Sequence, residues 1–446
     1  MFDNPLFKNT LKMSLSNVLM YFVPIVVTPI LSRMYSQEAF GEWGVFSSTI
    51  AILSVGMFWG YEHAIVKASS ESDAQHVGII CLINSLITIL FTVLAFEVGS
   101  TTNVSFFQSF PEKYLLIIYL FIYALYLILY NFCNRQEKYN VLAISHVVLG
   151  GSQAIFRISF GLIVLVTVNG LILGTTLAQA LNVLFILVCL KGLLNNMRWT
   201  SFSIEKVKEL YLQNRRFPLY DAPASIMSFA AFQSPTIILS QFFTKAEIGC
   251  FSIIIQLLLM PMSFIGTAMG KVYYQQLCRT QGDYDAIREV SKKVVNTVCL
   301  ISIMPLLFLS VGGDQLLVIF LGEKWTASSE IALCLALWSF PTILSQPLIP
   351  LYRKLDRQKN LLLFNALYFI GGVGSITYGC LSGRPLSLIL LIFSLVTALC
   401  KFCMFTNLLK LCGLGYKQLN KYIVFLWLIS IMLLAIRIKD IVTVSI

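Results

Sequence analysis

The stretch Thr28-Pro29-Ile30-Leu31-Ser32, followed nine positions later by Gly41, recurs as Thr236-Ile237-Ile238-Leu239-Ser240, with Gly249 again nine positions later. In both places the stretch closes an apolar segment, crosses a short polar turn and opens a second apolar segment at the glycine. The predicted turns are Arg33 to Ala39 and Gln241 to Glu247. A unit that occurs twice in one chain predicts two related halves, which is how many transporters are built.

The composition is that of a membrane protein. Hydrophobic residues make up 57% of the chain and charged residues 12%, whereas a soluble domain carries about 25% charged residues, and the mean hydropathy is +0.80. Helices satisfy their own backbone groups in lipid, and the long apolar segments do not fit the short alternating strands of a barrel. We therefore predict an all-α polytopic membrane protein with about 12 transmembrane helices and a short thirteenth candidate. The predicted spans are residues 11–32, 40–60, 77–98, 114–132, 144–168, 170–190, 217–241, 247–270, 293–312, 328–350, 360–380, 386–409 and 421–437.

The charge distribution sets the expected orientation. The formal net charge is +11, and with the N-terminus inside, most of the 32 Lys and Arg residues fall in cytoplasmic loops. Arg157 is counted apart from the loops, because it falls deep inside the predicted span 144–168. This positive-inside bias predicts a cytoplasmic N-terminus and basic loops that face the anionic leaflet, and it makes a nucleic-acid partner a poor explanation of the charge.

The predicted organisation is two six-helix lobes, residues 1–190 and 217–410, joined by a cytoplasmic linker at 191–216 and followed by a tail at 411–446. In the linker, Ile204, Val207 and Tyr211 recur at helical spacing. They predict either an amphipathic helix on the inner membrane surface or a solvated linker helix. The segment Tyr422 to Ile436 either spans, which places the C-terminus outside, or lies at the interface.

Neither a metal nor a cofactor is expected. The eleven cysteines have no recurring spacing, the Cys400 and Cys403 pair has no neighbouring histidine, and the three histidines are scattered. The outward loops are short and leave no room for an outer catalytic domain, so we do not expect an enzyme.

Small polar residues form one face of the first span and of its repeat. Asn17, Thr28 and Ser32 share a face in the first copy, and Thr236 and Ser240 keep the pattern in the second. We interpret the stripe as the lining of a cavity; the alternative is that the hydroxyls bond to their own helix.

The following span of the second copy carries Gln256 and Lys271 along one face. Lys271, like His63 of the first copy, lies at the predicted cytoplasmic end. Each of these two side chains either faces a cavity or reaches the phosphate headgroups.

Arg157 is the most informative single residue. It is predicted near mid-bilayer, where inserting a charge costs on the order of 3 kcal/mol or more, and Gln153 shares its face. A permanent guanidinium there suits an anionic ligand such as phosphate, which it grips with forked hydrogen bonds. The alternative is a structural ion pair, for which Glu62, Glu97 and Asp221 are the nearest carboxylates.

Glu62, His63 and Asp221 mark the predicted cytoplasmic ends of spans two and seven. A carboxylate partly removed from water has a raised pKa and can carry a coupling proton, or it simply caps a helix. We predict a coupling or gating role, with H+ and Na+ both open as coupling ions.

Several stretches resemble bacterial polysaccharide-unit flippases of the Wzx kind. They are spread from about residue 8 to 410, so the resemblance does not rest on one motif. The stretches are Leu31 to Gly41 (LSRMYSQEAFG), Tyr61 to Val66 (YEHAIV), Leu259 to Gly266 (LMPMSFIG), Leu321 to Trp325 (LGEKW) and Gln358 to Leu363 (QKNLLL).

The resemblance implies the fold of the multidrug/oligosaccharidyl-lipid/polysaccharide (MOP) exporters, with two MATE-like lobes in a V around a cavity. It also implies a ligand, undecaprenyl-diphosphate-linked oligosaccharide. Alternating access would turn this lipid from the inner to the outer leaflet of the bacterial inner membrane for O-antigen or capsule-type polysaccharide. The polymerase and chain-length regulator of lipopolysaccharide biosynthesis are then candidate partners.

One position departs from the family pattern. An Arg is expected just before Tyr61-Glu62, and this chain has Gly60. Arg157, Lys271 and Arg33 are then left to supply positive charge to the cavity.

Two rival functions stay open at this point. A cation or drug antiporter of the same fold would favour acidic and aromatic cavity residues. A membrane polysaccharide polymerase or ligase would need a large outer loop that bears catalytic residues.

Overall fold

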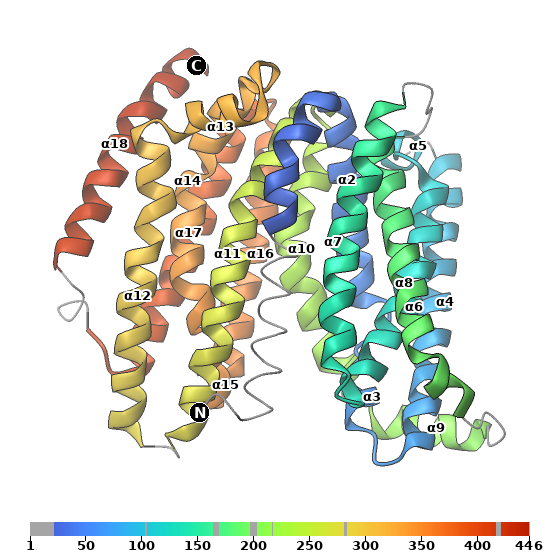
Figure 1. Cartoon of the computed structure of the whole chain (residues 1–446). Helices are drawn as coiled ribbons and strands as arrows, with labels where there is room; N and C mark the ends of the chain where they lie inside the picture. The colour runs from blue at the N-terminus through green and yellow to red at the C-terminus, as the bar shows by residue number, and fades with distance from the viewer. Residues whose placement is uncertain are drawn as a thin grey trace. The chain divides into compact units, whose positions relative to one another are not determined.

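The computed structural model describes residues 22–102, 105–163, 169–196, 203–215, 217–280, 283–415 and 421–445. Every regular element in these ranges is helical (Figure 1). The chain divides into two compact units, Met1–Gln233 and Ser234–Ile446, and the boundary falls inside one helix, α10. Each unit is described by itself below.

Unit 1 is a bundle of long helices with three short ones. The helix Phe22–Met34 comes first among the described residues. It is followed by α2 (Gln37–Gly56), α3 (Glu62–Lys67), α4 (Glu71–Thr101), α5 (Ser105–Ser109), α6 (Lys113–Arg135), α7 (Tyr139–Leu162), α8 (Gly170–Asn196), α9 (Ile204–Gln213), a π-helical turn (Phe217–Asp221) and α10 (Ala222–Leu239).

Unit 2 is also a bundle of long helices with short helices between them. Its helices are α11 (Lys245–Arg279), α12 (Tyr284–Val311), α13 (Gly313–Leu321), α14 (Ala327–Ser345), α15 (Pro350–Lys354), α16 (Gln358–Leu381), α17 (Leu386–Leu411) and α18 (Lys421–Ser445), with 3-10 turns at Glu323–Trp325 and Gln346–Leu348.

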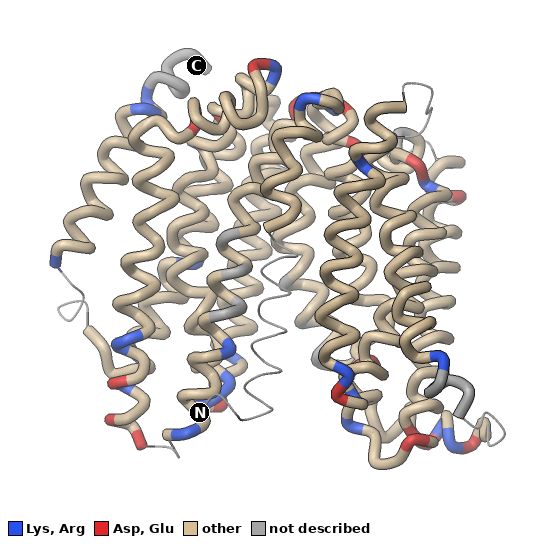
Figure 2. The backbone as a smooth tube through the Cα atoms, viewed as in Figure 1, with Lys and Arg blue, Asp and Glu red and all other residues tan. Residues whose placement is uncertain are grey.

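The all-α membrane fold is confirmed. Among the described residues, 10 helices are long and apolar enough to cross a membrane, and Phe22–Met34 and Phe229–Leu239 are shorter apolar helices. Within each unit, charged residues gather mainly at the helix ends, while the middles of the helices are almost free of them (Figure 2). This is the distribution that a hydrocarbon layer imposes, because a charge is costly at mid-membrane.

The sequence repeat is also a structural repeat at its helix starts. α2 begins at Gln37 and α11 begins at Lys245, which are equivalent positions of the two copies. Ser36 caps α2 by accepting from the Ala39 N–H, and Thr244 caps α11 in a capping box with Glu247. The predicted turns were too long, because these caps start the helices four residues before the repeat glycines.

The thirteenth segment is a helix packed on unit 2. The Trp427 Nε1 donates to the Cys299 carbonyl of α12 at 3.3 Å, and Arg437 Nη1 donates to the Leu309 carbonyl at 2.9 Å. Both pairs have the same sequence separation, so α18 runs parallel to α12. Its stretch Lys421–Lys439 is one of the helices of spanning length.

Candidate functional site

The hydroxyls of the repeated polar stripe bond to their own helices. Thr28 donates to the Pro24 carbonyl at 2.6 Å, Ser32 to Pro29 at 3.1 Å and Ser240 to Ile237 at 2.8 Å. The exposed Arg33 also donates back, to the Pro29 carbonyl at 2.8 Å. Thr236 is buried, and Asn17 lies outside the described residues.

Arg157 is buried inside unit 1 and is held by three helices. It lies on α7 and is 8% exposed. Its Nε and Nη2 donate to the Thr175 Oγ1 of α8 at 3.3 and 2.7 Å, and its guanidinium carbon lies 4.9 Å from the ring centre of Trp43 on α2. The Tyr35 hydroxyl donates to the Arg157 carbonyl at 2.6 Å.

The predicted bounds of the helix that carries Arg157 need correction. α7 begins at Tyr139 and ends at Leu162, where Ile163 is extended, and residues 164–168 lie outside the described residues. Arg157 therefore lies about 8 Å from the end of its helix, at 1.5 Å per residue. Gln153, one turn earlier, is half-buried.

No described carboxylate forms an ion pair with Arg157. Glu97 pairs with Lys113 at 3.5 Å, and Glu62 lies 3.8 Å from His63. The side chain of Asp221, which ends the π-helical turn, is not among those described. Among the side chains that the structure describes, the guanidinium is therefore contacted by a hydroxyl and an aromatic face, both neutral, and by no counter-ion.

Gly60 explains the departure from the family pattern. α2 stops at Gly56, and the chain then turns through Trp59 and Gly60 with φ of 54° and 82°. A Cβ at Gly60 would lie 3.2 Å from the Cβ of Phe217. An Arg at this position would need both a left-handed backbone and space that Phe217 occupies. The predicted span 40–60 ends early for the same reason.

Glu62 and His63 open the short helix α3. His63 is exposed, and its ring centre lies 6.1 Å from that of Phe217, while Glu62 is partly buried. The neighbouring Tyr61 is fully buried, and burial raises the pKa of its hydroxyl well above the usual value. It donates to the Tyr211 carbonyl of α9 at 2.9 Å.

The predicted residues of unit 2 lie on α11. Gln256 is half-buried, and Lys271 is exposed. α11 continues to Arg279, beyond the predicted end at residue 270, so Lys271 lies within the helix and not at its end.

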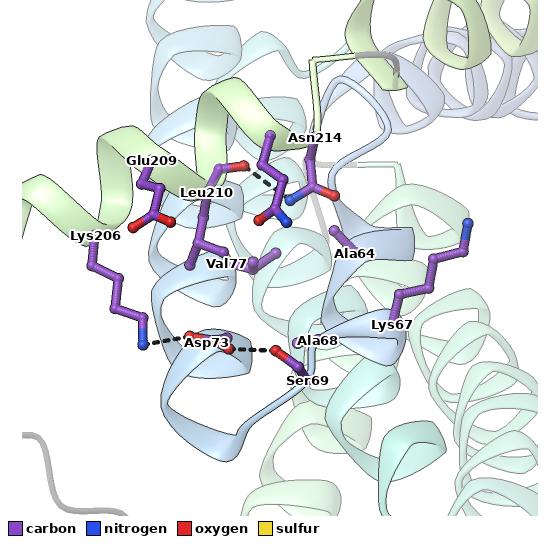
Figure 3. A pocket seen from close by; sticks show the side chains of 11 residues that line it. Ala64, Lys67, Ala68, Ser69, Asp73, Val77, Lys206, Glu209, Leu210 and Asn214 are labelled. Carbon is purple, nitrogen blue, oxygen red and sulfur yellow. Dashed lines mark hydrogen bonds and ion pairs between the residues drawn. The ribbon is translucent and has the colours of Figure 1, made fainter.

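A pocket at the α3–α4 turn was missed by the sequence analysis. It has a volume of about 460 Å³ and lies against α9 (Figure 3). Lys206 of α9 pairs with Asp73 of α4 at 2.5 Å, and the Ser69 hydroxyl donates to the same carboxylate at 2.8 Å. The linker helix α9 is therefore held against α4 within unit 1, a contact that the spacing of Ile204, Val207 and Tyr211 could not reveal.

Lys401 of unit 2 was also missed. It lies in α17, is 6% exposed, and its Nζ is 4.4 Å from the ring centre of Tyr368 on α16. All eleven cysteines are free thiols, and no group of three or more metal-ligating side chains occurs in the part of the chain that the structure describes.

Solved structures of the same fold are transporters. The lipid II flippase MurJ, in an inward closed conformation, matches with a TM-score of 0.69 at 14% identity and covers 97% of this chain and 93% of its own. An inward-facing multidrug resistance MATE family transporter of the MOP superfamily matches with a TM-score of 0.67 at 15% identity, with 89% and 94% covered. A MOP superfamily transporter from Pyrococcus furiosus matches with a TM-score of 0.58 at 14% identity, with 91% and 96% covered.

At these identities the structural likeness establishes the fold. No curated protein matches the chain in sequence. The family model described as polysaccharide biosynthesis protein matches residues 30–330, which is more than half of the sequence. This multi-pass membrane protein with the MOP transporter fold therefore belongs to the polysaccharide biosynthesis protein family.

Proposed function

We propose that the protein is a flippase for undecaprenyl-diphosphate-linked oligosaccharide. It moves the lipid-linked unit from the inner to the outer leaflet of the bacterial inner membrane by alternating access, with the N-terminus in the cytoplasm. The substrate class fits the family, and the fold is shared with a lipid II flippase. A sugar-diphosphate headgroup needs such a protein, because moving its charges and hydroxyls into hydrocarbon without partners is prohibitive.

The buried charge of Arg157 carries this proposal. Among the described residues, the buried carboxylates Asp73 and Asp314 are both neutralised, by Lys206 and Arg437. Arg157 has no carboxylate, and its Nη1 makes no hydrogen bond to a described residue. The uncompensated buried charge of unit 1 is therefore positive, which favours an anionic substrate over the cation of an antiporter.

The other polar residues are assigned to the sugars and the diphosphate. Gln153 and Gln256 offer amides, and Lys271 adds a second cation for phosphate. Thr28, Ser32 and Ser240 serve as acceptors, because a hydroxyl that donates to its own helix still has lone pairs, and Thr236 is assigned the same role. The coupling ion and the roles of Glu62, His63 and Asp221 in gating belong to the same proposal.

The test is complementation of a deletion strain. The strain is expected to accumulate lipid-linked units that are inaccessible from outside, and wild type restores surface polysaccharide. Arg157→Met and Arg157→Ala should fail to restore surface polysaccharide, although the variant proteins reach normal levels in the membrane. Arg157→Lys keeps the positive charge but loses the forked pair of hydrogen bonds, so it should restore surface polysaccharide in part. The exposed Arg384 provides the control, since Arg384→Ala should behave as wild type.

Normal surface polysaccharide in both Arg157→Met and Arg157→Ala would refute the assigned role of Arg157. Unchanged lipid-linked pools in the deletion strain, together with drug sensitivity, would instead identify an antiporter. A polymerase or ligase would be identified by units that reach the outer leaflet and stay unpolymerised or unattached.

A further inference from the structure

Helices α6, α7 and α8 of unit 1 are aligned in register over most of their length. The Tyr130 ring stacks on His146, with centres 6.1 Å apart. Tyr119 lies eleven residues before Tyr130 on α6, and Arg157 lies eleven residues after His146 on antiparallel α7, so the same register places Tyr119 and Arg157 at one level. On α8, Thr175 bonds Arg157 at one end, and Leu190 joins Leu142 of α7 in one apolar cluster at the other.

This register defines four levels, which we call the tyrosine column. The levels are Tyr119 with Arg157 and Thr175, Tyr123 with Gln153 and Gln179, Tyr126 with Gly150 and Asn182, and Tyr130 with His146 and Ile186. Successive tyrosine rings lie 5.8, 5.7 and 5.8 Å apart between centres. The column extends about 16 Å along the helices, since each residue rises 1.5 Å.

Two buried amides in the column lack hydrogen-bond partners. Asn182 is 0% exposed, and neither its Oδ1 nor its Nδ2 bonds a described residue; the same holds for the Nε2 of Gln179, which is 1% exposed. Both lie on the face of α8 between Thr175, which contacts α7, and Ile186, which packs against α6 and α7. An unpaired amide in hydrocarbon costs several kcal/mol, so these groups indicate a small polar partner.

Water fits this position better than a sugar does. The Tyr119 and Tyr123 rings are stacked, and the next two pairs of rings are tilted with their centres 5.7 and 5.8 Å apart, which leaves little room for a sugar ring between them. A buried water typically makes about three hydrogen bonds, and the column contains tyrosine hydroxyls and the amides of Gln153, Gln179 and Asn182 at successive levels.

We propose that the tyrosine column holds bound water and conducts protons between His146 and the Arg157 level, and that Arg157 gates this path. The inference rests on the proposed function. A fixed cation repels a proton moving along a water chain, so the path is closed while Arg157 is uncompensated. When a diphosphate neutralises the guanidinium, protons pass, and substrate binding is thereby coupled to proton movement.

Each step conserves protons. His146 takes up one proton on its imidazole and passes it to the neighbouring water. Every water accepts one proton and donates one, and the last water releases a proton beyond the Arg157 level.

The experiment measures proton flux into vesicles of phosphatidylethanolamine and phosphatidylglycerol that contain the full-length protein. A potassium diffusion potential drives the flux, and a pH-sensitive dye reports it. Wild type should conduct slowly with undecaprenol and faster with undecaprenyl diphosphate. Arg157→Met should conduct at least about tenfold faster than wild type without any anion, because a unit charge at about 10 Å contributes about 1.7 kcal/mol at an effective dielectric constant near 20.

Variants that interrupt the tyrosine column should lower the proton flux. Asn182→Leu and His146→Phe should abolish flux in the Arg157→Met background. Asn131→Leu provides the matched control, because Asn131 of α6 already bonds the Leu127 carbonyl at 2.8 Å, and its flux should equal that of the parent.

Radiolytic hydroxyl labelling tests the water directly and also detects a variant that conducts through a misfolded state. Tyr123 and Tyr126 should be oxidised far more than the buried Tyr368, whose hydroxyl accepts from Trp338, and Asn182→Leu should suppress their oxidation. Flux in Arg157→Met no greater than in wild type, or unlabelled column tyrosines, would overturn the proposal. If Arg157→Met conducts constitutively while undecaprenyl diphosphate leaves wild type unchanged, the column is supported and the proposed substrate is contradicted.

Discussion

Arg157 is fixed by two neighbours of different chemistry. Thr175 accepts two of its N–H groups, and the Trp43 ring covers its guanidinium. Thr175 can do so because it also donates to its own helix, to the Leu171 carbonyl at 2.6 Å, which leaves its lone pairs free. The pair orients a permanent charge that would otherwise turn toward the membrane surface.

Replacing Thr175 by Val should loosen this arrangement without changing the shape of the side chain. We expect Thr175→Val to lower the free energy of unfolding by about 1 kcal/mol, the usual worth of a hydrogen bond between membrane helices, and to reduce surface polysaccharide severalfold. Unfolding in mixed micelles and complementation of the deletion strain provide the measurements.

The adjacent Thr176 is a matched control. It is also buried and donates to the Ile172 carbonyl at 3.0 Å, and it makes no bond to Arg157. Equal losses in Thr175→Val and Thr176→Val would show that the contact with Arg157 has no separate effect.

At the scale of elements, α18 is attached to unit 2 by a buried ion pair. Arg437 of α18 grips Asp314 of α13 through Nη1 at 2.5 Å and Nη2 at 3.0 Å, and the Ser329 hydroxyl donates to the same carboxylate. Asp314 is 1% exposed. Burial alone would raise the pKa of this carboxyl, but the bonds from Arg437 and Ser329 outweigh burial and hold the pKa below its usual value.

Arg437→Met should therefore destabilise unit 2 by about 3–5 kcal/mol, because it leaves a buried carboxylate unpaired. Adding Asp314→Asn should recover part of the loss, and the exposed Lys439→Met should have little effect. Thermal unfolding in detergent measures all three. A loss in Lys439→Met as large as that in Arg437→Met would contradict the role of the pair.

The ion pair between Arg437 and Asp314 also predicts how the stability of the protein changes with pH. A carboxyl whose pKa is lowered by folding stabilises the fold above its unfolded pKa of about 3.9, and this contribution is lost as the pH falls through the folded pKa. The stability advantage of wild type over Asp314→Asn should thus hold at neutral pH and shrink below about pH 4. An advantage that is independent of pH down to pH 3 would contradict this assignment.

At the scale of the whole molecule, α18 decides on which side the chain ends. An added spanning helix parallel to α12 puts the C-terminus opposite the cytoplasmic N-terminus that the basic loops predict. A fluorescent-protein fusion after Ile446 should be dark, because the reporter does not fold when exported, while an alkaline phosphatase fusion there should be active.

Ending the chain at Gly415, before α18, should reverse both signals. Fluorescence from the full-length fusion together with inactive phosphatase would show that α18 does not cross the membrane or that the orientation is inverted.

The sequence determined the helical class, the repeated unit and the presence of a buried Arg157. Apolar length, the spacing of Thr28, Ser32, Thr236 and Ser240, and charge placement are local properties that a single chain displays without its fold. The helix starts at Gln37 and Lys245 follow from their caps, Ser36 and Thr244, and were equally available in the sequence.

The tertiary structure decided which groups meet. Asp73 and Lys206 are far apart in sequence, as are Asp314 and Arg437, and no spacing rule links them. Gly60 stands where an arginine is expected, and the tertiary structure shows that a side chain there would be strained by the left-handed turn and crowded by Phe217. The partners of Arg157 and the register of the tyrosine column depend on how three helices pack. The sequence gives the chemistry of each side chain, but only the packing of the helices determines which side chains are neighbours.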